Sequence, residues 1–382
     1  MGEMKRLWAA VSILAALLAA ALGTGWWVDG LTADYVSRLE QAQAMSERGD
    51  WERAAQVTGG VYRNWQERSF WLHALLRHSD TDQVLLLFRS VEEYLKLEEM
   101  DQYAAANAQL IAQLEEAGVT VLDLSADYRL HDPKVYEAWY NTPHTSPELL
   151  SQTVYGLPEL NREGLSALAA RQAAGEAVLV SVPGCYPTAT ALAATPALAA
   201  GLASGDLVIS DAISGVSGAG RGCNARTHFC HANESVEAYG VAKHRHTPEI
   251  EQTLSEVAGR QIDVVFTPHL APLTRGLLAT VYMEAADGVD AERVQAAYEE
   301  RYANEPLVTV LPAGSMPSTS SVVGTGRAQV GVALDDRRRR TIIASCAIDN
   351  LGKGAAAQAM QCANIVCGLA ERTSVDSAAP LI

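Results

Sequence analysis

The distribution of apolar residues divides the chain into three stretches of different character. Residues 7–27 contain no charged side chain, residues 28–116 repeat apolar residues at helical spacing, and short apolar runs begin after residue 117. Apolar side chains three and four positions apart indicate amphipathic helices, whereas short β-branched runs bounded by glycine or proline indicate strands. The pattern predicts a helical N-terminal third followed by an α/β or α+β body.

The first stretch has the length and composition of a membrane anchor. It spans about 21 residues, follows Lys5 and Arg6, and has tryptophans near both ends, as membrane-spanning helices do. Positive charges ahead of the span predict an N-terminus in the cytosol. A cleaved signal peptide, favoured by the small residues at 21–25, and a buried core helix are the alternatives.

Residues 28–116 predict a small all-α segment, either a bundle or a hairpin. Glycines at 49 and at 59–60 indicate breaks between its helices, and Asp101 is a candidate N-cap. No cluster of histidines and carboxylates suggests catalysis here. The segment resembles short, membrane-anchored helical proteins of unknown function from spore-forming bacteria.

The body from residue 117 onward alternates apolar strand-like runs with helical ones. Its last helix is expected at Gly354–Glu371, and Arg337–Arg340, between two apolar runs, reads as an exposed hairpin turn rather than a phosphate site. The strands are expected at 119–124, 177–183, 207–214, 263–269, 277–285, 328–334 and 341–349.

Charge and cysteine content narrow the functional classes. A net charge of -16 and a pI near 5.0 argue against nucleic acid as the main partner, because phosphate binding needs a cationic surface. The six cysteines show no metal-binding spacing. Free thiols in a reducing compartment are therefore expected, which conflicts with an anchor that would export the body.

The run SVPGCYPTATAL places Cys185 between a strand end and a helix. Pro187 suits the first turn of that helix, and Gly184 allows close approach of the backbone. The amides and dipole at a helix N-terminus favour a thiolate and can hold an oxyanion. Cys185 is thus a candidate nucleophile, whose alternative is a small buried side chain.

The run AKHRHTPEIE offers a partner base. If the segment is extended, His244 and His246 share one face and Arg245 points to the other. Glu249 follows. Zinc binding is the competing interpretation, but no third ligand lies at a suitable spacing.

Three arginines lie in loops and suit anionic groups, namely Arg221, Arg245 and Arg275. A surface ion pair is the alternative for each. The loop Ser214–Gly220 follows a predicted strand and has the composition to wrap a phosphate or a nicotinamide amide, although glycine and serine alone are weak indicators.

From about residue 117 to 371 the chain resembles the N-acetyl-gamma-glutamyl-phosphate reductase family, which is related to aspartate-semialdehyde dehydrogenases. The runs that carry the resemblance are LDLSADYRL, VYGLPELNR, VPGCYPTATAL, SGVSGAGR, KHRHTPEI, FTPHLAPLTRG and IDNLGKGAAAQAM. The resemblance implies an NADPH-dependent, phosphorylating acyl-phosphate reductase of arginine biosynthesis. It also implies a homo-oligomer formed through the sheet of the catalytic domain.

The resemblance further implies site residues and domains. Cys185 is the acyl-accepting nucleophile and His246, preferred over His244, its acid/base partner. The implied substrate-binding residues are Arg221, His244, Arg245, Glu249 and Arg275, and the cofactor-binding residues are Ser125, Gly218, Gly220 and Asn350. The implied domains are a dinucleotide-binding remnant at 117–183, a catalytic and dimerisation domain at 184–350 and a C-terminal helix at 351–382.

One feature of the family is missing from the sequence. A strand followed by a glycine-rich phosphate-binding loop opens the family's dinucleotide-binding (Rossmann) domain, and no such loop occurs here, so the domain is expected to be truncated. The change of character falls near residues 114–118. A natural fusion, a gene-model error and an assembly chimera all account for it. An inactive reductase fragment joined to a membrane-anchored helical protein, and a related semialdehyde dehydrogenase, are the alternative functions.

Overall fold

A computed structural model describes residues 30–31, 33–46, 48–75, 120–220 and 225–376. The chain divides into two compact units, one comprising 1–121 with 175–178 and the other 122–174 with 179–382. Within the described residues, no helix combines the length and apolarity needed to cross a bilayer. The predicted anchor at 7–27 and the Asp101 cap lie outside the described residues.

The first unit is helical where it is described. Residues 33–46 form a helix, the chain turns at Gly49 with φ at +77°, and α2 (Trp51–Leu75) follows. The Tyr35 hydroxyl donates to Asn64 Oδ1 at 2.7 Å, which joins the two helices. The break predicted at Gly49 is thus confirmed.

The break predicted at residues 59–60 is wrong, because α2 continues through both glycines. Ala54, Val61 and Trp65 are buried and give α2 an apolar face. A glycine inside a helix costs only about 1 kcal/mol, and packing of an apolar face decides most helical stability in proteins. Packing has therefore outweighed the local preference of these glycines.

A small sheet of three strands carries the nucleophile loop. Its spatial order is β1 (Thr120–Asp123), β3 (Val178–Ser181) and β2 (Thr153–Tyr155), with β2 and β3 parallel. Both strands expected in this part of the chain are present, each slightly shorter than predicted. The helices and turns between these strands are α5 (Pro133–Tyr140), η1 (Pro147–Gln152) and α6 (Pro158–Ala173).

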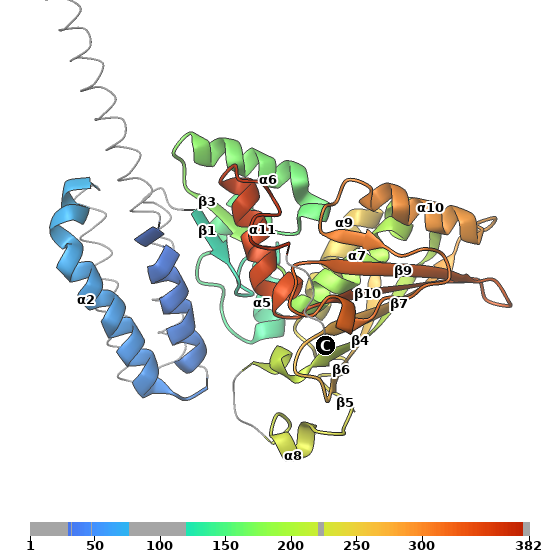
Figure 1. Ribbon diagram of the computed structural model, residues 1–382, viewed down its shortest axis with the longest axis horizontal. Helices are drawn as coiled ribbons and strands as arrows, with labels where there is room; N and C mark the ends of the chain where they lie inside the picture. The colour runs from blue at the N-terminus through green and yellow to red at the C-terminus, as the bar shows by residue number, and fades with distance from the viewer. Residues whose placement is uncertain (1–29, 32, 47, 76–119, 221–224, 377–382) are drawn as a thin grey trace, which may run out of the picture. The chain divides into compact units, whose positions relative to one another are not determined.

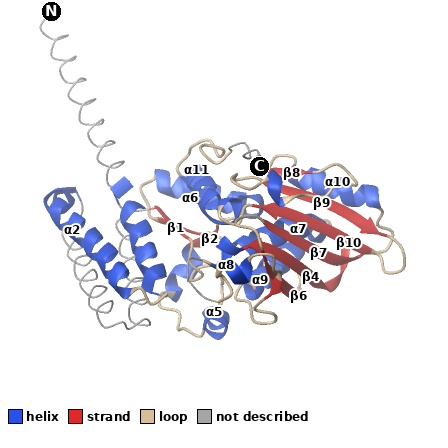
Figure 2. Ribbon diagram, turned by 60° about the horizontal axis from the view of Figure 1, so that its bottom comes forward, coloured by secondary structure: helices blue, strands red, loops and turns tan. Residues whose placement is uncertain are grey.

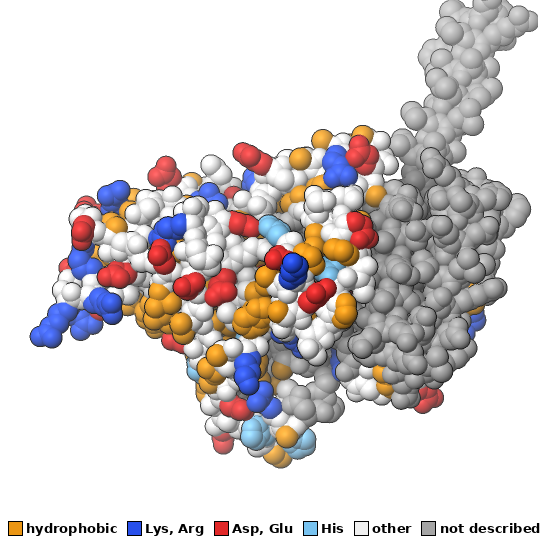
Figure 3. Space-filling model, turned by 180° about the vertical axis from the view of Figure 1, so that it is seen from behind, with side chains coloured by type: hydrophobic (Ala, Val, Ile, Leu, Met, Phe, Trp, Pro, Cys, Tyr) orange, Lys and Arg blue, Asp and Glu red, His pale blue; other side chains and the backbone are white. Residues whose placement is uncertain are grey.

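A mixed sheet of seven strands is the larger of the two described sheets and belongs to the second unit (Figures 1 and 2). Strand β4 pairs parallel with β6 and antiparallel with β7, and β10 lies antiparallel between β7 and β9. In spatial order the strands are β5 (Glu237–Ala238), β6 (Asp263–Ala271), β4 (Ala203–Gly215), β7 (Leu277–Ala285), β10 (Thr341–Ile348), β9 (Ala328–Asp335) and β8 (Val308–Val310). The arginine-rich turn joins β9 to β10 as predicted, and Figure 3 shows basic side chains gathered at that end of the molecule.

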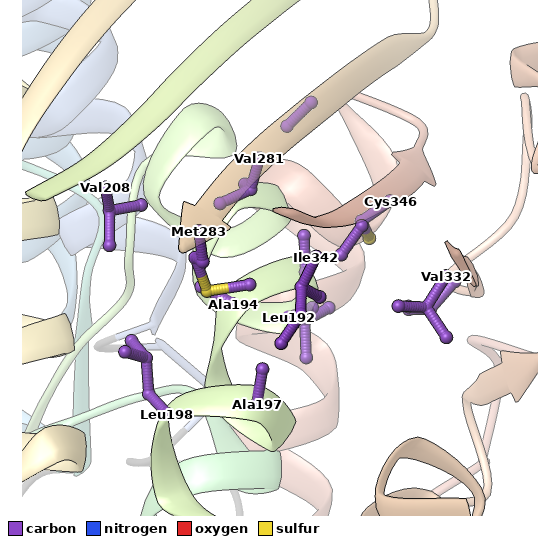
Figure 4. Packing of buried hydrophobic residues seen from close by; sticks show 14 of the residues in the cluster. Leu192, Ala194, Ala197, Leu198, Val208, Val281, Met283, Val332, Ile342 and Cys346 are labelled. Carbon is purple, nitrogen blue, oxygen red and sulfur yellow. The ribbon is translucent and has the colours of Figure 1, made fainter. Parts of the chain in front are cut away.

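One face of the large sheet is covered by three helices. α7 (Cys185–Ala199) packs on β7 and β10, α9 (Thr247–Ala258) on β6, and α10 (Ala291–Tyr302) on β9. Alternate strand residues point toward the helices, so small side chains of α7 lie against branched side chains of the sheet (Figure 4). This core fixes the first residue of α7, which is Cys185.

The opposite face of the sheet carries apolar side chains that stay exposed. Leu207 and Ile209 of β4 are 49% and 37% exposed, and Val265 of β6 is 51% exposed. They alternate with buried residues along the same strands. Adjacent exposed apolar residues on a flat sheet are typical of an interaction surface.

The C-terminal segment runs from β10 back to α6. A π-helical turn, η4 (Gly352–Ala356), precedes α11 (Ala357–Val366), which packs on α6. The helix predicted at 354–371 is therefore real but shorter, because Gly368 adopts φ of +68°, the left-handed conformation that ends helices. The remaining short elements are η2 (Val216–Ala219), α8 (Phe229–Ala232) and η3 (Thr319–Ser321).

A buried ion pair holds η4 to α6. Lys353 Nζ lies 2.6 Å from Glu159 Oε1, and both side chains are fully inaccessible to solvent. The Gln361 side chain accepts from Lys353 at 2.5 Å and donates to Glu159 at 3.3 Å. The three groups together satisfy much of one another's hydrogen-bonding capacity.

Candidate active site

The loop from β3 to α7 places Cys185 at the first position of α7, as the sequence predicts. The Val182 amide donates to the Asp123 carbonyl at 2.7 Å, and the Gly184 amide donates to Glu249 Oε1 at 3.1 Å. The Thr188 hydroxyl donates back to the Gly184 carbonyl at 2.9 Å. The loop is thus fixed from β1, from α9 and from within α7.

Two glycines bring other groups against Cys185. A Cβ added to Gly184 would lie 2.5 Å from His246 Nε2, so the imidazole rests directly on the residue before the cysteine. A Cβ added to Gly354 would lie 2.7 Å from the Cys185 Cβ. Neither position has room for a side chain, and Cys185, which is half-buried, lies between η4 and the His246 side of the loop.

Burial raises the pKa of the Cys185 thiol to about 11, although the adjacent backbone amide and Arg129 act in the opposite direction. The expectation that the helix N-terminus favours a thiolate is therefore wrong in its net result. Loss of hydration destabilises the charged form by more than the amides and dipole stabilise it. The cysteine is held as a neutral thiol that requires a base.

His244 and His246 lie together, but in a turn rather than an extended segment. Their ring centroids are 4.9 Å apart, and the backbone amide of His246 donates to His244 Nδ1 at 3.2 Å. The turn arises because α9 begins immediately afterwards at Thr247. As predicted, the two histidines point to one side and Arg245 to another. Both imidazole rings pack on Tyr186, whereas the Arg245 guanidinium lies over the Tyr140 ring.

Both imidazoles are neutral at physiological pH. Burial, followed by the charge of Arg245, lowers the pKa of His244 to about 4. Burial, followed by the charge of Arg129, lowers the pKa of His246 well below its usual value. His246 Nδ1 is buried without a hydrogen-bond partner among the described residues. A neutral imidazole beside a neutral thiol has the protonation needed for general-base catalysis.

Arg129 is a site residue that no local pattern in the sequence predicts. Its Nη1 lies 3.5 Å from Glu249 Oε2 and its Nη2 donates to the Leu124 carbonyl at 2.6 Å. The Tyr155 hydroxyl donates to Glu249 Oε1 at 2.8 Å. Glu249 therefore joins Arg129, Tyr155 and the Gly184 amide. The sequence indicates Arg129 only through its place in LDLSADYRL, which is one of the runs that carry the family resemblance.

A cleft of about 880 Å³ opens beside this network. Its lining includes Arg129, Tyr140, Gly218, Arg245 and His246, which come from four separate segments of the chain. The side chain of Arg129 is only 9% exposed, and Arg245 is exposed. Four cationic side chains thus line the cleft, Arg129 in its wall and Arg226, Lys243 and Arg245 as well, in a chain of net charge -16.

The predicted residues Arg275 and Asn350 are not among those that line the cleft. The Arg275 guanidinium binds the buried carboxylate of Asp349, with Nη2 2.8 Å from Oδ2. Asn350 accepts from the Gly276 amide at 2.8 Å and donates to Ser217 Oγ at 3.0 Å. Asn350 therefore ties two loops together.

The other predicted residues have varied positions. Ser125 binds the buried carboxylate of Asp123 through both its amide and its hydroxyl, each at 2.9 Å. Gly218 lines the cleft, and Gly220 ends η2 with φ of +78°. Arg221 lies outside the described residues. Among the residues that the structure does describe, no group of three or more potential ligands is arranged to hold a metal.

Comparison with protein-family models yields three matches. Residues 185–350 match the dimerisation domain of semialdehyde dehydrogenases, and residues 101–168 match the NAD binding domain of semialdehyde dehydrogenases. Residues 27–116 match a domain of unknown function. The first match begins at Cys185 and contains the histidine turn.

Curated relatives and solved structures agree with these matches. The chain is 50% identical over 266 residues to the N-acetyl-gamma-glutamyl-phosphate reductase of Symbiobacterium thermophilum, an alignment that covers 69% of this chain and 74% of the relative. The chain is 49% identical over 258 residues to the reductase of the same name from Desulforudis audaxviator, an alignment that covers 68% of this chain and 72% of the relative. Aspartate semialdehyde dehydrogenase II from Vibrio cholerae shares the fold, with a TM-score of 0.51 at 18% identity and coverage of 68% and 76%. The chain belongs to the N-acetyl-gamma-glutamyl-phosphate reductase family.

Proposed function

We propose that this chain reduces N-acetyl-glutamyl 5-phosphate to the 5-semialdehyde with release of phosphate, in arginine biosynthesis, and that it uses NADPH. Cys185 is the nucleophile and His246 the acid/base group. The observation that carries this proposal is the contact of the His246 imidazole with Gly184, directly before a cysteine at a helix N-terminus. Identity of about half over some 260 residues with reductases of this name supports it.

The proposed chemistry begins with a proton transfer. His246 takes the thiol proton of Cys185 as the sulfur attacks the acyl carbon, because both groups start neutral. The new C–S bond forms as the bond from carbon to the phosphate oxygen breaks, and phosphate leaves. A thioester on Cys185 remains. Amides at the start of α7 are suited to stabilise the oxyanion of each tetrahedral species.

Release of the aldehyde reverses the proton transfer. A reduced nicotinamide, when bound, supplies the hydride that the acyl carbon accepts. Hydride addition leaves a tetrahedral oxyanion, which collapses to the aldehyde as the C–S bond breaks, and the imidazolium of His246 returns its proton to the departing sulfur. His246 thus acts as base in one half of the reaction and as acid in the other.

Arg129 is proposed to stabilise the departing phosphate. It lies beside the nucleophile loop, since a Cβ on Gly184 would be 3.1 Å from its Nη1. Its Nε is buried and has no hydrogen-bond partner among the described residues. An arginine held in this way by Glu249 suits an anion that gains charge as the bond to carbon breaks. Glu249, predicted to bind substrate, is instead proposed to position Arg129 and the Gly184 amide.

The residues present fit the nicotinamide end of the cofactor. Gly218 lines the cleft without a side chain, so a flat ring can lie against its backbone, and a Cβ at this position would lie 2.7 Å from Ser214 Oγ. Asn350 would hold that loop through Ser217. Ser125, Gly218 and Gly220 are the residues proposed to contact the cofactor, and the match to the NAD binding domain, which spans residues 101–168, supports the placement of Ser125.

The domain boundaries and partners are proposed on the same grounds. Residues 28–116 form a helical segment, 117–183 a dinucleotide-binding portion, 184–350 the catalytic and dimerisation domain, and 351–382 a C-terminal segment. A second copy of the chain is proposed to cover the exposed face that bears Leu207, Ile209 and Val265, because the matched domain is a dimerisation domain. The reductase body is placed in the cytoplasm, with any membrane contact made through residues 7–27.

A turnover assay with the purified full-length chain tests the proposal. N-acetyl-glutamyl 5-phosphate and NADPH are expected to yield phosphate and NADP in equal amounts, and Cys185→Ser is expected to abolish the reaction. Calorimetry with NADPH measures cofactor affinity separately. Absence of both turnover and millimolar NADPH binding would favour the inactive-fragment alternative. An unchanged rate in Cys185→Ser would refute the assigned nucleophile.

A further inference from the structure

The arginines that line the cleft differ in what they bind. Arg129 pairs with Glu249, and Arg226 pairs with Glu237 at 3.2 Å. Arg245 has no acidic partner among the described residues. The Tyr140 hydroxyl donates to the Arg245 backbone carbonyl at 3.5 Å, a contact that does not involve the guanidinium. The guanidinium of Arg245 thus keeps its N–H donors available to an anion that enters the cleft.

Tyr140 fixes the position of that guanidinium. The Arg245 Cζ lies 5.4 Å from the centroid of the Tyr140 ring. The Tyr140 ring stacks on Tyr136 with centroids 4.7 Å apart and planes 13° from parallel. The Tyr136 hydroxyl in turn donates to Asp127 at 2.6 Å. An arginine held over a ring face keeps its edge free, so the stack orients the donors without occupying them.

We propose that Arg245, positioned by Tyr140, is the subsite that recognises the carboxylate of the substrate remote from its reacting acyl group. This proposal rests on the proposed function and extends it to substrate selection. The substrate has two anionic groups, and the phosphate must lie beside Cys185, where Arg129 is. Arg245 suits the second anion, because it lines the cleft one residue from His246 and its guanidinium has no acidic partner among the described residues, whereas Arg226 is paired with Glu237. Tyr140 is thereby a positioning residue that determines specificity.

Steady-state kinetics of the full-length chain test the subsite. Tyr140→Leu removes the stack, and we expect KM for N-acetyl-glutamyl 5-phosphate to rise about fivefold with kcat nearly unchanged, since a cation–π contact contributes about 1 kcal/mol. Tyr140→Phe keeps the ring and is expected to restore affinity. Lys134→Ala removes a positive charge from the same helix outside the cleft and serves as the matched control.

A substrate analogue separates charge recognition from general damage. Wild type is expected to prefer the carboxylate substrate over its carboxamide analogue by a large factor in kcat/KM, and Arg245→Gln is expected to lose most of that preference. An Arg245→Gln variant that retains the full preference would overturn the proposal. Equal KM values for Tyr140→Leu and Tyr140→Phe would show that the Tyr140 ring does not position Arg245.

A binding measurement keeps this proposal distinct from the reductase function. N-acetylglutamate carries the same carboxylate and cannot react, so its protection of Cys185 from iodoacetamide reports affinity without turnover. We expect protection to need about fivefold more ligand in Tyr140→Leu. Protection in a chain that shows no turnover would uphold the subsite while refuting the enzyme. Protection that is identical in wild type, Tyr140→Leu and Arg245→Gln would refute the subsite alone.

Discussion

Replacing Lys353 by methionine is expected to destabilise the second unit strongly. The change keeps the length of the side chain but removes the charge that faces Glu159, whose carboxylate is fully inaccessible to solvent. Glu159 Oε2 already has no hydrogen-bond partner among the described residues, so little in the pocket would compensate the lost ammonium group.

The magnitude follows from the geometry of the pair. At 2.6 Å and an effective dielectric constant of about 20, the attraction that disappears is about 6 kcal/mol. The variant no longer has to bury a charged ammonium group, which offsets part of this lost attraction. Breaking a buried ion pair by removing one partner costs about 3–5 kcal/mol net. For a unit of this size that corresponds to roughly 10 °C in unfolding temperature.

Thermal unfolding followed by circular dichroism measures this effect. The double variant Lys353→Met with Glu159→Gln is the key comparison, because a neutral amide needs no counter-ion and still accepts from Gln361. We expect the double variant to recover most of the lost stability. The reasoning would be refuted if the single variant unfolded at the wild-type temperature, or if the double variant were the less stable of the two.

Three further predictions concern the active site. The Cys185 pKa of about 11 predicts that its alkylation rate rises about tenfold per pH unit up to that value, measured by mass spectrometry of the modified peptide. The pKa of His244 is lowered to about 4 in the folded protein, below its unfolded value of about 6.5. Stability is therefore expected to fall as the pH drops from about 6.5 toward 4. In His244→Asn the unfolding temperature is expected to fall less steeply over this acidic range. Gly354→Ala places a Cβ 2.7 Å from the Cys185 Cβ and is expected to lower kcat about a hundredfold, as measured by NADPH oxidation.

Each of these has a contrary outcome. A rate of Cys185 alkylation that levels off near neutral pH would mean that the thiolate is stabilised after all. Coincident acid limbs for wild type and His244→Asn would place the titrating group elsewhere. For Gly354→Ala the matched control is Gly205→Ala, whose Cβ would be 3.5 Å from Glu284, and equal kcat values in the two variants would contradict the close packing.

Strand and turn positions were predictable because local patterns determine them. β7 occupies 277–285 as expected, and the arginine-rich run joins β9 to β10. Cys185 was placed at a strand-to-helix junction from Gly184 and Pro187 alone, and α7 begins there. These features depend on neighbours within a few residues, which a single sequence displays.

The properties that arise from distant contacts were not predictable. The upward shift of the Cys185 pKa depends on burial by groups such as Gly354, which lies far along the chain. The function of Glu249 depends on meeting Arg129 and Tyr155, which precede it by about a hundred residues. The continuity of α2 through its glycines likewise depends on packing that overrides local preference.

The ion pair between α6 and η4 also sets an order of events during synthesis. Glu159 leaves the ribosome 194 residues before Lys353, which at about 5–20 residues per second is an interval of roughly 10–40 s. By the end of that interval the nascent chain contains Cys185, His246 and every described strand of the large sheet but lacks Lys353 and Gly354, which lie against the nucleophile loop and α6. A ribosome-bound chain stopped before residue 350 should therefore expose its Cys185 thiol to reagents that reach it slowly in the completed protein.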